Sequence, residues 1–257
     1  MDIPMLENER LDDLQYHGLR ILQKRDGFCF GVDAVLLSHF ARVSKNDTVI
    51  DLGTGTGIIA VLLAAKREPY KVTGLEIQQE MAEMAARSIK WNGLEDKVEI
   101  VQGDIKRAVE LFGASSYDAV VTNPPYMGRG GGLLNPTDSK AVARHEILCT
   151  LEEVVSAAAG LLRPGGKFSM VHRPQRLVDI IWHMRNYAIE PKSLRLVYPS
   201  PGKEPNLVLI SGTKDGKSEL RIQKPLYIYD SSGQYSAEIN EIYNRDAGEK
   251  RNGIAQI

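Results

Sequence analysis

The chain has 257 residues, of which 43% are hydrophobic and 25% are charged, and its net charge is −1. It is long enough for one large globular domain or two small ones, and its composition excludes a disordered or fibrous chain. The N-terminus is acidic, so we expect no signal peptide, and no apolar run reaches 18 residues, so we expect no membrane helix. The two cysteines, Cys29 and Cys149, are far apart, which argues against a disulfide scaffold. Together these features predict a cytoplasmic protein.

Short apolar runs alternate with amphipathic stretches along the first half of the chain. The segment 28–43 predicts a helix that covers an edge of a sheet. The run 47–53 is rich in β-branched residues and ends in glycine, which indicates a buried strand, and 58–67 has helical character. The further elements predicted here are strands at 70–77, 97–104 and 117–126, and a helix at 78–93 that ends in an Asn-Gly stop signal.

The same alternation continues in the second half. The predicted elements are a helix around 147–162, a strand at 166–172, a helix at about 174–187, and strands at 193–199 and 206–212. The last two strands flank a short turn, so we expect them to form an antiparallel hairpin. The whole pattern predicts an α/β fold with a seven-stranded, mostly parallel sheet and helices on both faces.

A glycine-rich turn, from Asp51 to Gly57, lies where the first predicted strand meets the first predicted helix. Glycines allow a tight turn, and the helix N-terminus offers free N–H groups to a ligand. From Gly55 onward the chain satisfies the GxGxxA form of a dinucleotide-binding pattern, so the glycines alone leave an NAD-dependent enzyme open. The candidate ligand-binding residues of the turn are Asp51, Gly53, Thr54, Gly55 and Gly57.

Two further acidic residues follow neighbouring predicted strands. Glu76 ends the second strand, where a carboxylate can accept both hydroxyls of a ribose, and Asp104 follows the third, where a carboxylate can accept an adenine amino group. With Asp51 they line the carboxyl edge of the sheet, where α/β folds bind ligands. The alternative is that these acids cap the helices that follow them.

Four features of the sequence, in their order and spacing, resemble the S-adenosyl-L-methionine-dependent methyltransferases of the Rossmann-like class I. They are VIDLGTGTG, Glu76, the QGD that ends at Asp104, and NPPY at 123–126. The resemblance covers roughly 28–172. It implies S-adenosyl-L-methionine as cofactor, with the glycine turn at its methionine part, Glu76 at its ribose and Asp104 at its adenine. The residues implied to pack on the adenine faces are Ile77 and Ile105.

We therefore expect a single methyltransferase domain over 1–257. Within it we expect an N-terminal helical cover at 1–47, a catalytic core at 48–212 and a C-terminal extension at 213–257.

The NPPY motif suggests how such an enzyme would activate an amine. An exocyclic amine on a base, or an amide nitrogen, is a poor nucleophile because its lone pair is delocalised. The side-chain oxygen of Asn123 and the carbonyl of Pro124 could accept its two N–H bonds and favour the geometry of attack, and the prolines preset these acceptors. Tyr126 would stack on the planar target. The expected catalytic residues are Asn123, Pro124, Pro125 and Tyr126, and Asn123 would also border the cofactor.

NPPY is shared by methyltransferases that act on adenine N6, guanine N2 or protein glutamine amides. The segment 22–41 resembles the FGxDAxLL element of bacterial enzymes that methylate N6 of the adenine just 3′ of the anticodon in a valine tRNA, and 201–212 and 225–243 resemble that family too. It implies that Asp33 borders the methionine end of the cofactor. Guanine-N2 methylation of rRNA, glutamine-N5 methylation, a noncatalytic RNA-binding module and an NAD-dependent oxidoreductase are the alternatives.

Charge is unevenly distributed along the chain. Residues 120–225 carry 15 Lys and Arg against 9 Asp and Glu, whereas residues 1–119 carry 14 against 19. The positive block suits an RNA partner. Within it, the candidate phosphate contacts are Arg129, Lys140 and Arg144. The five histidines show no metal-ligand spacing, so we expect no metal.

Overall fold

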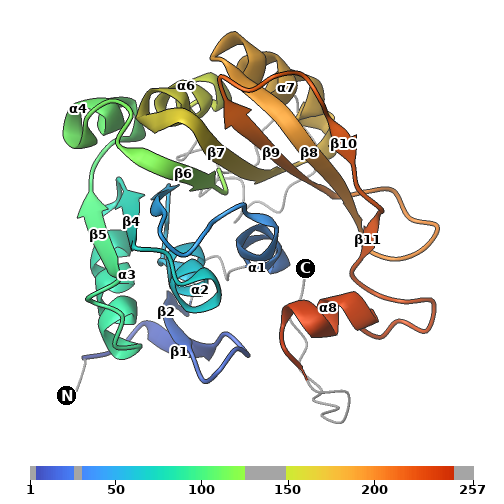
Figure 1. Cartoon of the computed structure of the whole chain (residues 1–257). Helices are drawn as coiled ribbons and strands as arrows, with labels where there is room; N and C mark the ends of the chain where they lie inside the picture. Colours follow the sequence, from blue (N-terminus) through green and yellow to red (C-terminus); the bar gives the residue numbers. More distant parts are fainter. Residues whose placement is uncertain (1–3, 26–30, 125–148, 246–257) are drawn as a thin grey trace.

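The computed structural model describes residues 4–25, 31–124 and 149–245. A mixed sheet of nine strands forms its centre, with helices on both faces (Figure 1). The strand order is β10-β8-β9-β7-β6-β3-β4-β5, and β11 also pairs with β8. The predicted α/β class is confirmed.

Five parallel strands form one side of the sheet. They are β3 (Thr48–Leu52), β4 (Lys71–Glu76), β5 (Val98–Gln102), β6 (Tyr117–Thr122) and β7 (Leu162–His172). The chain moves outward from β3 through β4 to β5, then returns to pair β6 with the other side of β3. In α/β folds, ligands bind at such a reversal of strand order, which here lies at the carboxyl ends of β3 and β6.

The predicted hairpin is formed by β8 (Ile189–Tyr198) and β9 (Leu207–Lys214). β9 inserts antiparallel between β7 and β8. The seven predicted strands therefore correspond to β3–β9. Two short strands, β10 (Arg221–Ile222) and β11 (Leu226–Tyr227), extend the sheet beyond the prediction by pairing with the outer edge of β8.

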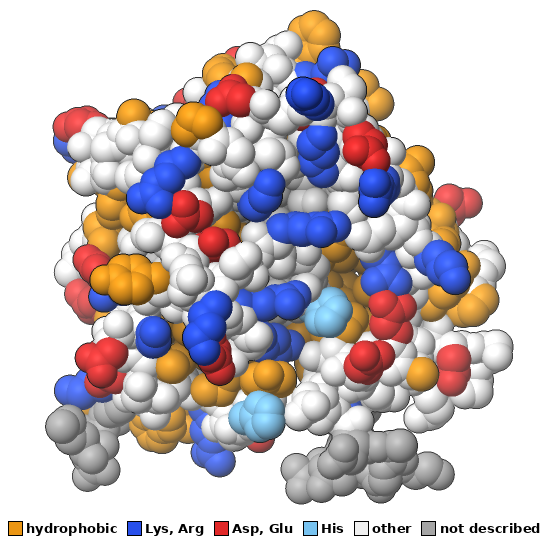
Figure 2. Space-filling view, viewed as in Figure 1, with side chains coloured by type: hydrophobic (Ala, Val, Ile, Leu, Met, Phe, Trp, Pro, Cys, Tyr) orange, Lys and Arg blue, Asp and Glu red, His pale blue; other side chains and the backbone are white. Residues whose placement is uncertain are grey.

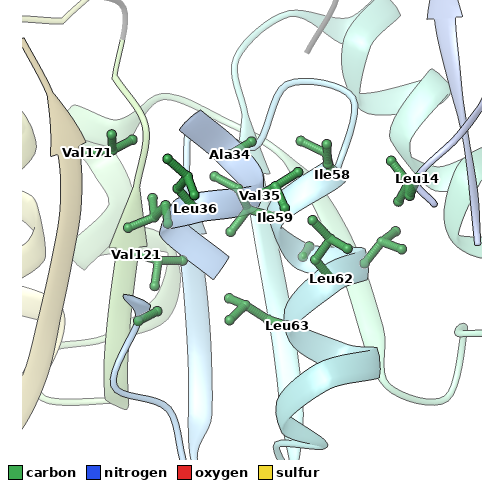
Figure 3. Close-up of a cluster of buried hydrophobic side chains, with 14 of the residues drawn as sticks. Leu14, Ala34, Val35, Leu36, Ile58, Ile59, Leu62, Leu63, Val121 and Val171 are labelled. Carbon is green, nitrogen blue, oxygen red and sulfur yellow. The ribbon is translucent and has the colours of Figure 1, made fainter. Parts of the chain in front are cut away.

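Two hydrophobic clusters pack against the two faces of the sheet. On one face lie α1 (Val32–Phe40), α2 (Ile58–Arg67), α3 (Gln79–Trp91) and α8 (Ala237–Ile242). Figure 3 shows part of this cluster, in which side chains of α1 and α2 meet Val121 of β6 and Val171 of β7. On the other face lie α4 (Ala108–Phe112), α6 (Leu151–Leu161) and α7 (Leu177–Asn186).

The N-terminal cover predicted as helical over 1–47 is not helical in its first part. Residues 9–24 form an antiparallel hairpin, β1 (Glu9–Asp13) and β2 (Arg20–Lys24), which packs against α3. The backbone N–H of Leu22 donates to Ser88 Oγ, and the Arg87 guanidinium pairs with the buried Glu9 carboxylate. These distant partners stabilise strands that the local sequence pattern does not reveal.

The predicted helix 28–43 corresponds to α1, but its position differs from the prediction. α1 contacts α2, β7 and β9, so it lies on a face of the sheet and not at its edge. The same hydrophobic cluster includes Leu14 near the start of the described chain and Ile242 near its end. This continuity supports our proposal that the chain is a single domain.

Candidate active site

The glycine-rich turn connects the carboxyl end of β3 to α2. Gly53, Gly55 and Gly57 all have positive φ angles, of 75°, 57° and 87°, which L side chains rarely adopt. The backbone N–H groups of Gly53 and Thr54 both donate to the carbonyl of Leu75 on β4, at 2.9 and 3.0 Å. The turn is therefore fixed to the neighbouring strand. A Cβ added at Gly55 would meet no atom within 4 Å, so the turn faces open space there.

Asp51 lies at the carboxyl end of β3 and is completely buried. Its Oδ2 accepts from the Thr54 hydroxyl at 2.6 Å, while Oδ1 has no hydrogen-bond partner in the described parts of the chain. Burial raises the pKa of Asp51 to about 7; the Thr54 hydrogen bond opposes this rise and the nearby Glu76 carboxylate adds to it. A buried oxygen without a partner suits a site that a ligand or water completes.

Glu76 ends β4 and is also buried. Its Oε2 accepts from the N–H of Gly55 at 2.9 Å, and its Oε1 accepts from the N–H of Gln78 at 2.9 Å. The carboxylate therefore fixes the glycine turn. Each carboxylate oxygen can accept a second hydrogen bond, so these contacts leave capacity for two ribose hydroxyls.

Asp104 follows β5 and is partly exposed. Its Oδ1 accepts from the N–H of Lys106 at 2.9 Å, so it caps a short 3₁₀ helix at Ile105–Arg107, and the Lys106 ammonium lies 3.6 Å from Oδ2. Asp104 therefore has the capping role that the sequence analysis gave as the alternative to ligand binding. Ile77 and Ile105 are half-buried. A Cβ built on Gly53 would lie 3.8 Å from Ile105 Cδ1, which places this isoleucine beside the glycine turn.

Asn123 and Pro124 follow directly after β6. The Thr122 hydroxyl donates to the Leu52 carbonyl at 2.9 Å, so the ends of β6 and β3 are joined immediately before the motif. The Nδ2 of Asn123 donates to the Oδ2 of the buried Asp33 at 3.2 Å. Asn123 therefore lies at the same edge of the sheet as Asp51.

Asp33 lies in the first turn of α1, and the helix N-cap is Gly31. The structure thus places Asp33 against the NPPY motif from a segment 90 residues earlier in the chain. Several predicted site residues lie outside the described residues: Pro125, Tyr126, Arg129, Lys140 and Arg144.

His172, at the carboxyl end of β7, is a residue of this edge that the sequence analysis passed over. The pairing of β6 with β7 ends at Thr122 and Met170, so His172 lies two residues beyond the last paired residue of β7. His172 is buried, and its Nδ1 accepts from the N–H of Arg173 at 2.7 Å. Burial, together with the nearby Arg176 cation, lowers the pKa of His172 to about 4. It is therefore neutral at physiological pH. Its proximity to the motif follows from strand pairing, which a lone histidine does not signal.

Within the described ranges, no group of three or more His, Cys, Asp or Glu side chains could hold a metal ion. No helix in the same ranges is long and apolar enough to cross a membrane. This edge of the sheet therefore combines a glycine turn with open space beside it, three buried carboxyl groups and one amide from the NPPY motif.

Comparison with known proteins agrees with this geometry. Residues 31–181 match the family model described as the methyltransferase small domain. Relatives named tRNA1(Val) (adenine(37)-N6)-methyltransferase include proteins of Porphyromonas gingivalis, 31% identical over 81% of this chain and 84% of theirs, and of Bacteroides fragilis, 32% identical over 71% and 76%. A solved structure of a predicted O-methyltransferase from Agrobacterium tumefaciens, 23% identical, superimposes with a TM-score of 0.67 over 86% of this chain and all of its own, which shows a shared fold.

Proposed function

The chain belongs to the methyltransferase small domain family, and we propose that it transfers the methyl group of S-adenosyl-L-methionine to N6 of an adenine in the anticodon loop of a tRNA. The observation that supports this most directly is that the glycine turn after β3 and Asn123 after β6 lie at adjacent strand ends, joined by the Thr122–Leu52 hydrogen bond. Cofactor and amine would therefore meet at one point.

The residues of the carboxyl edge fit S-adenosyl-L-methionine. Under this proposal the methionine part lies against the glycine turn, where Asp51 Oδ1 lacks a partner among the described residues. Glu76 accepts the ribose hydroxyls with the lone pairs that Gly55 and Gln78 leave available. The adenine lies between the half-buried Ile77 and Ile105, with its amino group on Asp104.

When bound, the cofactor supplies a methyl group made electrophilic by its sulfonium sulfur. In our proposal, the oxygen of Asn123 and the carbonyl of Pro124 accept the two N–H bonds of the adenine amine, so that the nitrogen lone pair is directed at the methyl carbon. Transfer would form the N–C bond and break the C–S bond, whose electron pair would stay on sulfur. The extra proton on nitrogen then leaves to water.

Asp33 has a positioning role in this scheme. An amide side chain can be turned so that either its oxygen or its nitrogen faces the substrate, and only the oxygen can accept an N–H bond. Because Asn123 directs its Nδ2 to Asp33, its oxygen is turned to the other side. Asp33, which belongs to the segment that resembles FGxDAxLL, would thereby orient Asn123 of the NPPY motif.

The remaining residues of the proposal lie outside the part of the chain that the structure describes. Tyr126 would stack on the adenine, Pro125 would help to preset the acceptors, and the basic side chains Arg129, Lys140 and Arg144 would contact RNA phosphates. The net positive charge of residues 120–225 supports an RNA partner. We further propose that the protein acts in the cytoplasm, because that is where a tRNA substrate would be available.

Guanine N2 and glutamine N5 are the alternative acceptors that NPPY allows, but the similar relatives are named for adenine N6 of a tRNA. Incubation with methyl-labelled S-adenosyl-L-methionine and unmodified total tRNA, followed by digestion to nucleosides, tests the acceptor. We expect labelled N6-methyladenosine. Labelled N2-methylguanosine, or label in protein only, would contradict this function.

A further inference from the structure

A cavity of about 400 Å³ lies away from the candidate active site. α2 begins beside the glycine turn and ends at Arg67, which lines this cavity, and ten residues of helix span about 15 Å. Residues of α1, α8 and the outer strands form its other walls. Figure 2 shows basic side chains gathered around a hollow in the face where Figure 1 draws α1 and α8. The volume falls within the range of small-molecule sites, about 300–1,000 Å³.

The cavity is lined by three arginines and one histidine, and no Asp or Glu is among its described lining residues. Arg195 is neutralised, because its guanidinium forms a two-point ion pair with Glu238 at 2.6 and 2.7 Å. Arg42 is exposed, and no ion pair to it is found in the described part of the chain. Two positive charges, on Arg42 and Arg67, therefore remain uncompensated at the cavity.

Arg67 has donor capacity that the fold does not use. Its Nη2 donates to the backbone carbonyl of His39, but its Nε is buried and has no hydrogen-bond partner within the described residues. A buried donor of this kind is normally paired. Arg67 also lines the cavity, and a guanidinium in such a position is suited to a planar contact with a phosphate or carboxylate.

Neighbouring groups respond to the same positive field. Burial lowers the pKa of His39, and the Arg67 and Lys66 cations lower it further, although Glu238 opposes them. Burial also lowers the pKa of Lys66 to about 8, with a contribution from Arg67. The local charge balance thus favours an anion in the cavity.

We propose that this cavity is a binding site for a phosphate group, held by Arg67 and Arg42, with the organic part of the phosphate ester against the apolar wall of Leu36, Phe40 and Leu226. The phosphate could come from a free nucleotide or from the RNA backbone, which present the same chemistry. If the phosphate belongs to the RNA backbone, the RNA would contact the protein both at the reacting amine and at this distant cavity.

The first test is an NMR titration of His39 in the wild-type protein, with inorganic phosphate and AMP as probes. Its resonance is assigned with H39Q. If either probe binds, we expect the pKa of His39 to rise by half a unit or more, because the anion offsets the Arg67 and Lys66 cations. The double variant R42Q/R67Q should lose at least tenfold in affinity for the probe, while K203Q/R221Q, which removes the same charge from exposed positions elsewhere, should not.

The second test separates the two sources and does not depend on methyl transfer. A single-stranded RNA of twelve nucleotides without adenine is titrated into the wild type and both double variants at several salt concentrations. Backbone binding predicts that R42Q/R67Q alone binds more weakly, with the salt slope reduced by about 1. A response to AMP or phosphate but not to RNA assigns the site to a free phosphate ester. If no probe changes His39 and the double variants behave alike, the proposal is wrong.

Discussion

The amide of Asn123 donates its Nδ2 to the Oδ2 of Asp33 at 3.2 Å, joining the end of β6 to the first turn of α1. This bond spans 90 residues of sequence and is formed at a buried carboxyl group. It determines that the nitrogen end of the Asn123 amide is directed to Asp33 and the oxygen end away from it. In the proposed mechanism the oxygen must face the substrate, so the orientation of this one side chain connects the fold to the chemistry.

Replacement of Asp33 by alanine should lower kcat about tenfold to a hundredfold, because Asn123 loses a hydrogen bond that orients it. D33N, which keeps an oxygen acceptor, should retain much of the activity. Calorimetric affinity for S-adenosyl-L-methionine separates this role from cofactor binding. If D33A loses affinity by the same factor as kcat, Asp33 holds the cofactor and does not position Asn123.

Substitution of Asn123 by alanine removes one of the two proposed acceptors of the adenine N–H bonds. We expect methyl transfer to fall by at least about a hundredfold, as for other preorganised polar groups at a reaction centre. Cofactor affinity should change little. Single-turnover methylation and equilibrium dialysis measure the two quantities. An equal loss in both would show that Asn123 serves the cofactor only.

The change E76Q should weaken S-adenosyl-L-methionine binding by about tenfold to a hundredfold, because a neutral amide replaces hydrogen bonds from a charged acceptor. The amide nitrogen would also face a backbone donor, from Gly55 or Gln78, so a fall in Tm is expected as well. E83Q, an exposed change on α3, is the control for lost charge. Unchanged cofactor affinity in E76Q would remove Glu76 from the ribose site.

Asp51 should make stability depend on pH. Its pKa rises from 3.8 to about 7 on folding, so between these values the folded state holds a proton that the unfolded state releases. The stability that this proton contributes is present at low pH and decreases as pH rises from about 4 to 7, by at most about 4 kcal/mol. Urea unfolding of the wild type and D51N across this range should give free energies that diverge. Parallel curves would contradict the raised pKa.

Much of the fold could be predicted because its central elements are determined locally. The ten residues of α2 form the helix expected at 58–67. The glycine turn before them has positive φ angles that end strand β3, and the apolar run that follows forms the helix. The hairpin of β1 and β2 could not be predicted in this way. Its register depends on partners in α3, such as Ser88 and Arg87, which lie more than 60 residues away.

In the candidate site, too, some positions follow from local sequence patterns and others depend on distant parts of the chain. The positions of Asp51, Glu76 and Asn123 at one edge follow from parallel strands of similar length, a general property of the fold. The contact between Asn123 and Asp33 depends on how α1 packs on the sheet, and the proximity of His172 depends on strand order. Neither relationship is encoded in a local motif. The cofactor and RNA contacts of individual residues remain predictions.

The most direct test uses a valine tRNA transcript and a matched transcript in which adenine 37 is replaced by guanine. Each is incubated with the protein and methyl-labelled S-adenosyl-L-methionine, and its nucleosides are separated. We predict labelled N6-methyladenosine from the first transcript and none from the second. Equal labelling of both would contradict modification at this adenine, and labelled N2-methylguanosine would contradict adenine N6 as the acceptor.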